Sequence, residues 1–334
     1  MWRAGQSATL HWVPGPQGSN RASVEVSGLS DPTLLKVYAG TQRETPMAGT
    51  YRTQRELVFF EPRFPLLPGI DYVAISGDLS AAYRLPPRAP GVATRVTVVY
   101  PTANTLPLNL LKFYLHFSAP MSRGDSYRYI KLLNEKGKAV ELPFLELAEE
   151  LWNPELTRLT LLFDPGRIKR GVKPLEDIGS ALETDKRFTL EIAPPWKDGY
   201  GNPLLGAFRK RFRVGPADRT ALQPSRWRLT PPRVGTREPL TVLFNEPLDH
   251  ALALRLLRIR DTEGIVVLDN NEQRWRFTPA DPWQKRRYVL SASPLLEDLA
   301  GNNIGKTFDV DLSHPPAPFR NTPVLLPFTP KATT

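Results

Sequence analysis

Apolar and polar side chains alternate along residues 274–303, and this pattern predicts two β-strands joined by a proline break. Trp275 and Phe277 alternate with arginines and a threonine, so one face of the first strand is apolar and the other is polar. Residues 279–282 then interrupt the pattern with two prolines. A second strand around Tyr288 again has apolar residues at every other position, which places them on one face.

The two-strand unit closes with a short motif, Asp-Leu-Ala-Gly-Asn, that has a counterpart earlier in the chain, Asp-Gly-Tyr-Gly-Asn. Glycine and asparagine tolerate positive φ, and an aspartate carboxylate can accept backbone N–H bonds within a turn. We therefore predict two structural turns of the same kind. Their defining residues are Asp198, Gly201, Asn202, Asp298, Gly301 and Asn302.

The motifs that precede these turns are repeated as well, which indicates tandem domains. A strand ending in Phe-Asn-Glu-Pro-Leu-Asp at residues 240–249 lines up with one ending in Phe-Ser-Ala-Pro-Met-Ser at residues 111–122. A weaker version, without the closing turn, occupies residues 56–75. The predicted fold class is all-β, with two clear β-sandwich domains and a divergent third. The predicted parts are 1–93, a divergent sandwich; 94–215, a sandwich with insertions; 216–314, a further sandwich; and 315–334, a proline-rich C-terminal tail.

Proline marks most of the predicted boundaries. The 35 prolines among 334 residues are spread as separate breaks, which suits many short strands and does not suit long helices. Residues 81–90 are interpreted as an extended linker, and residues 308–312 as the last strand before the tail. Three units of roughly 100 residues are each long enough to bury a core.

Composition narrows the kinds of site that the chain can hold. There is no cysteine, so neither disulfides nor thiolate metal sites are available. The formal charge of +10 is spread over all three units, which favours weak attraction to anionic polymers over a nucleic-acid site. No apolar run is long enough to span a membrane, and no targeting segment is visible. Removal of a signal peptide or lipid anchor from an exported protein would leave such a start.

The ordered motifs Phe-Asn-Glu-Pro-Leu-Asp, Trp-Arg-Phe-Thr-Pro, a tyrosine-containing strand and Asp-Leu-Ala-Gly-Asn together resemble a known family. They look like the bacterial Ig-like domain of the surface-layer type, the SbsA-like Ig repeat. The likeness covers the second and third units and, weakly, the first. It implies β-sandwiches in a periplasmic, cell-surface or secreted protein that acts as a spacer or adhesion module, with no catalytic residues to transfer.

The second unit departs from the family pattern by two insertions, near residues 142–155 and 166–185. Loops at the ends of a rigid sandwich commonly carry binding, and an aromatic residue among charges suits a glycan or an envelope protein. The alternative is that the tryptophan packs on the sandwich and the charges are solvated. The candidate ligand-binding residues are Trp152, Glu146, Glu149, Glu150, Arg167, Lys169 and Arg170.

The sequence offers no clear catalytic or metal constellation. Its histidines fall in different units, so neither a histidine pair at metal-ligand spacing nor a Ser-His-Asp set is visible. They are His11, His116, His250 and His314, of which His116 is expected to be a core or sheet-face residue. Each closing turn supplies two oxygen-bearing side chains, fewer than the six to eight ligands that calcium takes. We therefore expect no cofactor, no metal and no enzymatic activity.

Three functional hypotheses follow. The leading one is a monomeric, non-enzymatic spacer or binding module of the bacterial envelope or exterior, with an envelope protein or a polysaccharide as partner. An alternative is the accessory region of a secreted carbohydrate-active or proteolytic enzyme. The third, a cytoplasmic nucleic-acid binder, would use Arg286, Arg287, Lys210 and Arg211 and would bind DNA with a steep salt dependence. Of these partners, nucleic acid is the one not expected.

Overall fold

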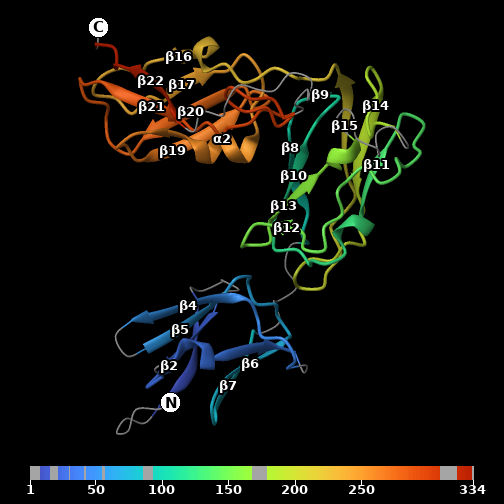
Figure 1. Cartoon of the computed structure of the whole chain (residues 1–334), viewed down its shortest axis with the longest axis vertical. Helices are drawn as coiled ribbons and strands as arrows, with labels where there is room; N and C mark the ends of the chain where they lie inside the picture. Colours follow the sequence, from blue (N-terminus) through green and yellow to red (C-terminus); the bar gives the residue numbers. More distant parts are fainter. Residues whose placement is uncertain are drawn as a thin grey trace.

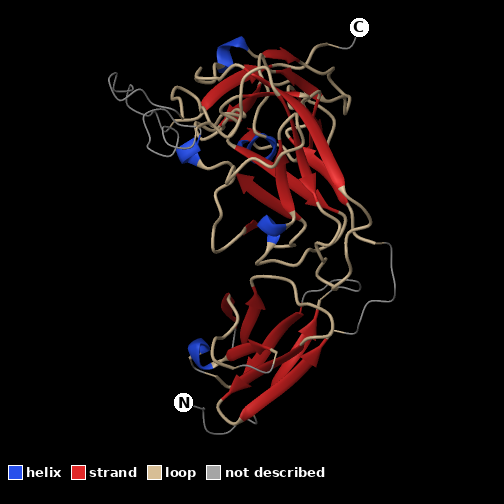
Figure 2. Ribbon diagram, turned by 90° about the vertical axis from the view of Figure 1, so that its right-hand side faces the viewer, coloured by secondary structure: helices blue, strands red, loops and turns tan. Residues whose placement is uncertain are grey.

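The computed structural model describes residues 8–15, 22–29, 31–40, 43–54, 57–85, 93–167, 179–308 and 322–332. Within these residues the chain forms six β-sheets and a few short helices. The sheets belong in pairs to three consecutive segments, which are called sandwich one, sandwich two and sandwich three (Figures 1 and 2). The predicted all-β class of tandem sandwiches is confirmed. None of the described helices is long and apolar enough to cross a membrane.

Sandwich one pairs a four-stranded sheet, in the order β1-β2-β5-β4, with a three-stranded sheet in the order β3-β6-β7. Its elements are β1 (Leu10–Pro14), β2 (Ala22–Ser27), η1 (Pro32–Leu34), β3 (Lys36–Ala39), β4 (Gly49–Gln54), β5 (Leu57–Pro62), β6 (Asp71–Ser76) and β7 (Leu79–Arg84). Alternate residues of both sheets, such as Val24, Val37 and Phe60, are fully buried between them. This alternation is what places one face of each strand in the core.

The linker interpretation of residues 81–90 is wrong for its first half. Residues 81–84 belong to β7, which pairs along its whole length with β6. Trp12 of β1 donates its indole N–H to the carbonyl of Ala81 at 3.0 Å and stacks on Tyr83. These contacts hold the stretch as an edge strand, although the prolines that follow suggested a linker. Residues 86–90 lie outside the described part of the chain.

Sandwich two pairs two four-stranded sheets, in the orders β12-β13-β10-β8 and β11-β14-β15-β9. Its elements are β8 (Val96–Tyr100), β9 (Thr105–Pro107), β10 (Lys112–Phe117), η2 (Ser126–Arg128), β11 (Ile130–Leu133), β12 (Leu151–Trp152), β13 (Arg158–Leu162), η3 (Pro165–Arg167), β14 (Arg187–Ile192) and β15 (Phe208–Gly215). Pairing is antiparallel except that β9 runs parallel to β15. The core between the sheets includes Phe113, Phe163 and Trp196, and it also takes in Leu299 from sandwich three.

Sandwich three pairs a sheet in the order β16-β17-β20-β19 with one in the order β18-β21-β22. Its elements are η4 (Pro224–Arg226), β16 (Arg228–Thr230), β17 (Leu240–Leu243), α2 (His250–Leu256), β18 (Leu257–Ile259), β19 (Gly264–Asp269), β20 (Arg274–Pro279), β21 (Tyr288–Ala292) and β22 (Val324–Phe328). The predicted strands around Trp275 and Tyr288 are β20 and β21. The pattern did not predict α2, whose N-cap residue Asp249 accepts the backbone N–H of Leu252 at 2.8 Å.

The C-terminal residues correct the predicted tail. Strand β22 pairs antiparallel with β21 from Tyr288↔Phe328 to Ala292↔Val324, and Phe328 is buried against Trp283. Residues 324–328 are therefore a strand of sandwich three, because their backbone pairs with the edge of β21 and Phe328 packs in the core. The predicted last strand at 308–312 lies, after its first residue, outside the described residues.

The two closing turns have the same backbone geometry. The N–H of Asp198 donates to the carbonyl of Asn202, and the N–H of Asp298 donates to that of Asn302. Each aspartate Oδ1 accepts two backbone N–H bonds, from Tyr200 and Asn202 in sandwich two and from Ala300 and Asn302 in sandwich three. Gly201 has φ 84° and Gly301 has φ 82°. The predicted structural turns are confirmed, with glycine as the residue at positive φ.

Candidate functional site

Glu150, a predicted ligand residue, is buried and has a structural part in sandwich two. Its carboxylate accepts the backbone N–H groups of Gly124 and Ser126 and the indole N–H of Trp152, at 2.7 to 2.9 Å. Burial acts to raise the pKa of Glu150, but these hydrogen bonds together hold it below its usual value. Because both oxygens are engaged, Glu150 fixes the loop at residues 122–126 and does not face a ligand.

Trp152 is half-buried against the core, as the alternative interpretation stated. Its ring lies 5.8 Å from that of Phe117 and 5.9 Å from that of Trp196. Glu146 and Glu149 remain exposed, and the Glu149 carboxylate lies 3.7 Å from the guanidinium of Arg63 in sandwich one. The structure therefore does not assemble these side chains into an aromatic binding platform.

Arg167 is also buried, with 3% of its surface exposed. Its guanidinium donates to the carbonyls of Gly179 and Glu141 at 2.5 and 2.7 Å, so it ties the two insertions together. This side chain was predicted to bind a ligand, and the structure assigns it to the protein interior instead. Lys169 and Arg170 lie outside the described residues.

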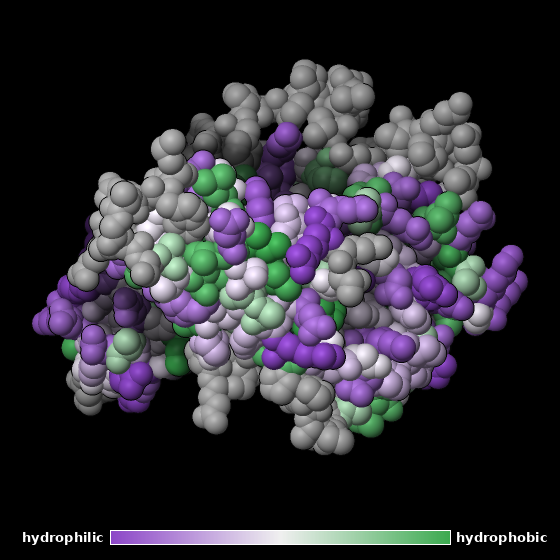
Figure 3. All heavy atoms as spheres, turned by 90° about the horizontal axis from the view of Figure 1, so that it is seen from below, coloured by the Kyte–Doolittle hydropathy of each residue, from purple (hydrophilic) through white to green (hydrophobic). Residues whose placement is uncertain are grey.

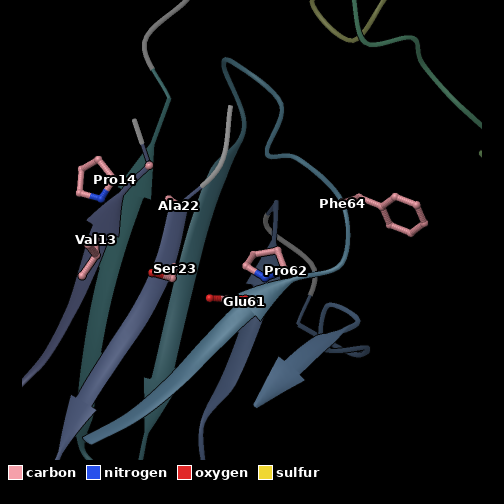
Figure 4. A pocket seen from close by; sticks show the side chains of 8 residues that line it. Val13, Pro14, Ala22, Ser23, Glu61, Pro62 and Phe64 are labelled. Atoms are coloured by element: carbon pink, nitrogen blue, oxygen red, sulfur yellow. The ribbon is translucent and has the colours of Figure 1, made fainter. Parts of the chain in front are cut away.

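A cavity in sandwich one lies between the ends of β1, β2 and β5 (Figure 4). It is lined by Val13, Pro14, Ser23 and Glu61, and the Glu61 carboxylate is already paired with Arg52 at 2.5 Å. Phe64 points away from the strands in Figure 4, and the guanidinium of Arg123 from sandwich two lies 4.1 Å from its ring centroid. Seen from this end of the molecule, hydrophilic and apolar side chains are interspersed (Figure 3). The cavity brings together no convergent set of polar groups.

Sandwiches two and three meet through a buried charge cluster. The ammonium of Lys112 lies 3.0 Å from Asp249 and 2.8 Å from Glu297, and the hydroxyl of Tyr114 donates to Asp249 at 2.9 Å. Burial acts to lower the pKa of Lys112, yet the two carboxylates raise it above its usual value. Lys112 therefore stays charged and holds two loops of sandwich three against β10.

A second polar contact in this joint uses the turn between β19 and β20. Asn270, Asn271 and Glu272 all have positive φ, from 52° to 62°, and this run turns the Glu272 side chain into the joint. The carboxylate, 1% exposed, accepts the backbone N–H and the hydroxyl of Thr102. Burial raises the pKa of Glu272 despite these bonds. A strained backbone persists only where its surroundings hold it, so this joint is a specific contact.

Two histidines from different sandwiches complete the joint. His250 of α2 stacks on Tyr100 with 3.4 Å between ring centroids, and its ring lies 6.4 Å from that of His116 on β10. Nδ1 of His250 and Nε2 of His116 are buried, and neither has a hydrogen-bond partner among the described residues. Burial, with His116 and Arg158 close by, lowers the pKa of His250 to about 4. The prediction of a sheet-face His116 is confirmed, whereas its proximity to His250 depends on the docking of two domains.

Three carboxylates gather beside the closing turn of sandwich three. Oxygens of Asp218, Glu246 and Asp298 lie within 4.8 Å of one another. Burial raises the pKa of Asp298 to about 7, and Asp218 adds to that rise. Such a set offers hard ligands for a cation. However, Oδ1 of Asp298 accepts two backbone N–H bonds and Oδ2 accepts the Asn302 amide, so its oxygens already serve the turn.

The outer face of sandwich two carries a groove lined by arginine, here called the arginine groove. Along β14 and β15, residues with odd numbers point away from the core, because Phe188, Leu190, Phe212 and Val214 are buried. The groove crosses β9, β15, β14 and the end of β11. Its outward residues are Thr105, Asn134, Arg187, Thr189, Arg211 and Arg213.

Two of the groove's arginines lack partners within the described part of the chain. Arg213 pairs with Asp185 at 2.7 Å, and Arg209, further along β15, pairs with Glu191 at 2.5 Å. The side chains of Arg187 and Arg211 make neither an ion pair nor a hydrogen bond with another described residue, and both are exposed. Among the residues of the third hypothesis, Arg211 thus faces the groove. Lys210 does not: it is buried and donates to the carbonyls of Thr102 and Ala103.

The sequence patterns predict binding residues in the two insertions and do not predict the arginine groove. The alternation of basic and apolar residues in β15 was visible, but the register that places Arg187 opposite Arg213, and Thr189 opposite Arg211, depends on strand pairing. Basic residues at alternate positions in two consecutive predicted strands are the signal that could have indicated a basic outer face here.

Comparison with known proteins gives distant structural similarities only. No family model matches the chain, and no curated protein matches it either. Similar solved structures include native α-2-macroglobulin from Escherichia coli, at 12% identity over 72% of each chain and a TM-score of 0.25. The I9–I11 tandem of titin matches at 11% identity over 83% of this chain and 90% of its own, with a TM-score of 0.19. The eight N-terminal Ig domains of the Down syndrome cell adhesion molecule match at 10% identity, over 89% of this chain and 37% of that one, with a TM-score of 0.18. All three TM-scores lie below 0.5, so the assignment of this chain to the all-β class of tandem sandwiches rests on its own strands and sheets.

Proposed function

We propose that this chain is a non-enzymatic spacer and binding module of the bacterial envelope or exterior, of the SbsA-like Ig repeat type. The observation that carries the proposal is the buried joint between sandwiches two and three, where Lys112, Asp249 and Glu297 form one charge cluster. A buried, hydrogen-bonded cluster of this kind fixes one relative orientation of two domains. Two sandwiches joined in this way keep their outer ends at a fixed separation, and a ligand bound at either end is held at that separation as well.

The arginine groove supports the binding half of the proposal. It lies on the outer face of a sheet in sandwich two, with two exposed cations that have no partner among the residues that the structure describes. The groove also favours a second candidate, the accessory substrate-binding region of a secreted enzyme. An accessory region would raise a fused hydrolase's rate on an insoluble polymer and leave its rate on a soluble fragment unchanged, whereas a spacer would change neither.

Rigidity is tested by distance measurement between spin labels. Because the chain has no cysteine, labels go only where cysteines are introduced. Lys138→Cys in sandwich two and Asp281→Cys in sandwich three are exposed positions, and Thr53→Cys serves sandwich one. We expect one narrow distance distribution for the 138–281 pair. A broad or multiple distribution for that pair would refute the spacer function.

The proposed location is tested separately. Antibodies against the purified chain should label intact or osmotically shocked cells of the source organism, and fractionation should recover the chain outside the cytoplasm. Recovery in the cytoplasm alone would overturn the proposed location and would favour an intracellular role for the same rigid pair of sandwiches.

A further inference from the structure

The pairing of β14 with β15 places like charges opposite each other on the floor of the arginine groove. Arg187 lies directly opposite Arg213, and Arg211 is the next outward residue along β15. Side chains opposite each other in an antiparallel pair have Cβ atoms about 5 Å apart, and like charges in such a pair destabilise the sheet. Asp185 compensates Arg213. The charges of Arg187 and Arg211 have no such compensation among the described residues.

The hydrogen-bonding character of the groove suits a polyol. Thr105 lies beside Arg213 on the neighbouring strand, Thr189 lies opposite Arg211, and Asn134 closes the β11 end. The threonine hydroxyls both donate and accept hydrogen bonds, whereas Asn134, whose Oδ1 already accepts the backbone N–H groups of Lys136 and Lys138, offers its amide NH₂ as a donor. They therefore match the hydroxyl groups of a sugar, while a guanidinium matches a carboxylate with two parallel bonds.

The same groove suits nucleic acid poorly. Single-stranded nucleic acid needs exposed aromatic rings on which bases stack, but Phe188 and Phe212 at the groove are buried. Double-stranded DNA carries about one charge per 1.7 Å of its axis. The carboxylates that line the groove are paired, Glu135 with Lys186 at 3.0 Å and Asp185 with Arg213 at 2.7 Å, so the groove offers the two cations of Arg187 and Arg211. Two cations match a ligand with separated negative charges better than a polyanion as dense as DNA.

We propose that the arginine groove binds a linear acidic polysaccharide, whose carboxylates pair with Arg187 and Arg211 while its hydroxyls bond to Thr189 beside them and to Thr105 and Asn134 at the two edges of the groove. This inference deepens the binding half of the proposed function and does not depend on the rigid joint. Free binding cations in the absence of the ligand cost the sheet some stability, as is common where a site is kept ready for function.

The test uses the whole chain and polygalacturonate as the probe. Affinity electrophoresis or calorimetry at low and at 0.15 M salt compares it with neutral dextran, poly-glutamate and a DNA duplex. We expect binding to polygalacturonate that weakens with salt, and no binding to dextran. Absence of polygalacturonate binding at low salt would overturn the proposal. Tighter binding of poly-glutamate or DNA would overturn the choice of a polysaccharide.

Variants distinguish a built site from general attraction. The double variant Arg187→Ala/Arg211→Ala should bind about 100-fold more weakly, because each charge-assisted pair contributes about tenfold or more. The matched control, Arg228→Ala/Arg258→Ala, removes two exposed strand arginines from sandwich three and should bind as the wild type does. Equal weakening in both would overturn the site. Replacing the pair by lysines keeps the charge and should weaken binding about tenfold, since lysine lacks the bidentate fork.

A stability measurement guards against misfolding of the double variant. Its melting temperature should be equal to or above that of the wild type, because the change removes the repulsion between Arg187 and Arg213. A lower melting temperature together with weaker binding would overturn the assignment of these arginines to binding. Loss of polygalacturonate binding with the 138–281 distance unchanged would refute the ligand alone, whereas a broad distance with binding retained would refute the spacer alone.

Discussion

Two joints connect the three sandwiches, and equivalent loops form both of them. The contacts between sandwiches one and two are shallow and exposed, whereas those between sandwiches two and three are deep and buried. In both, the closing turn of one sandwich faces the preceding sandwich. A Cβ added to Gly199 would lie 3.1 Å from Leu67 of sandwich one, and one added to Gly301 would lie 2.7 Å from Leu111 of sandwich two. The same turn can therefore make a shallow contact or a deep one.

The depth differs because the loops before the turns differ in charge. Met121 bridges to Asp198, and Leu248 bridges to Asp298, so the two loops are equivalent. The next residue is Ser122 in sandwich two, whose hydroxyl bonds within its own sandwich to the carbonyl of Lys197. In sandwich three that residue is Asp249, which reaches Lys112 and Tyr114 of the preceding sandwich.

The shallow joint relies on exposed contacts. Arg123 lies over the ring of Phe64, and Arg63 pairs with Glu149 at 3.7 Å, both side chains being more than 60% exposed. Exposed ion pairs contribute about 0 to 1 kcal/mol. The comparison predicts that the deep joint opens with the global unfolding of its two sandwiches, and that the shallow joint opens on its own.

The largest effect is expected from Lys112→Met, which leaves the buried carboxylate of Asp249 and the partly exposed carboxylate of Glu297 without their cation. Breaking a buried pair typically costs 3 to 5 kcal/mol, so we expect the opening free energy of the deep joint to fall by about 3 kcal/mol. This opening free energy is measured by hydrogen exchange of peptides that cover residues 96–117 and 240–256. Arg63→Met at the shallow joint should cost less than about 0.5 kcal/mol.

A matched double variant sharpens this prediction. Adding Glu297→Gln to Lys112→Met removes one of the uncompensated carboxylates and should recover part of the lost stability. Equal losses from Lys112→Met and Arg63→Met would show that the two joints do not differ in strength.

Gly301→Ala and Gly201→Ala compare the same turn in the two settings. Both residues have positive φ, which costs about 1 kcal/mol for alanine. At Gly201 an added Cβ meets nothing within 4 Å, whereas at Gly301 it meets Leu111 and, at 3.2 Å, Phe308. We expect a loss of about 1 kcal/mol for Gly201→Ala and about 2 to 3 kcal/mol for Gly301→Ala, measured by urea unfolding. Adding Leu111→Ala to Gly301→Ala should make the combined loss of stability smaller than the sum of the two single losses. Losses that simply add would contradict a clash between the new Cβ and Leu111.

Acid should weaken the deep joint through His250. The pKa of His250 is about 4 in the folded chain, against the usual 6.5. Between pH 4 and pH 6.5 the folded state therefore binds fewer protons than the unfolded state. Stability that is fully present above pH 6.5 is therefore lost as the pH falls towards 4. His250→Phe keeps a ring against Tyr100 and should lessen that loss by about 2 kcal/mol. Identical pH profiles of the two proteins would show that His250 does not titrate in the joint.

A small effect is also expected at Arg123, on the other contact of the shallow joint. A cation–π contact at an exposed site contributes about 0.5 to 1 kcal/mol, so Arg123→Ala should leave the melting temperature unchanged. It should nevertheless broaden the distance distribution between labels at residues 53 and 138, and leave the 138–281 distribution as it was. An unchanged 53–138 distribution would mean that other contacts hold sandwich one.

The candidate binding site was harder to predict than the fold. The sequence pointed to Glu150, Trp152 and Arg167 because charges beside a tryptophan in an insertion suit a ligand. Their burial comes from packing partners such as Trp196 and the carbonyl of Gly179, which lie far away in the sequence. Arg187 and Arg211 were not singled out together, because only the strand register places them side by side on one surface.

The sequence by itself determined the class of fold and the repetition within it. Alternating apolar residues define strands such as β14 and β20, and the Asp-x-x-Gly-Asn motif defines the closing turns, since these features depend on neighbours within a few residues. Only the tertiary structure decided that β22 completes sandwich three, that His116 meets His250, and that one joint is deep and the other shallow. Those outcomes depend on contacts between segments far apart in the chain, whose geometry no local pattern records.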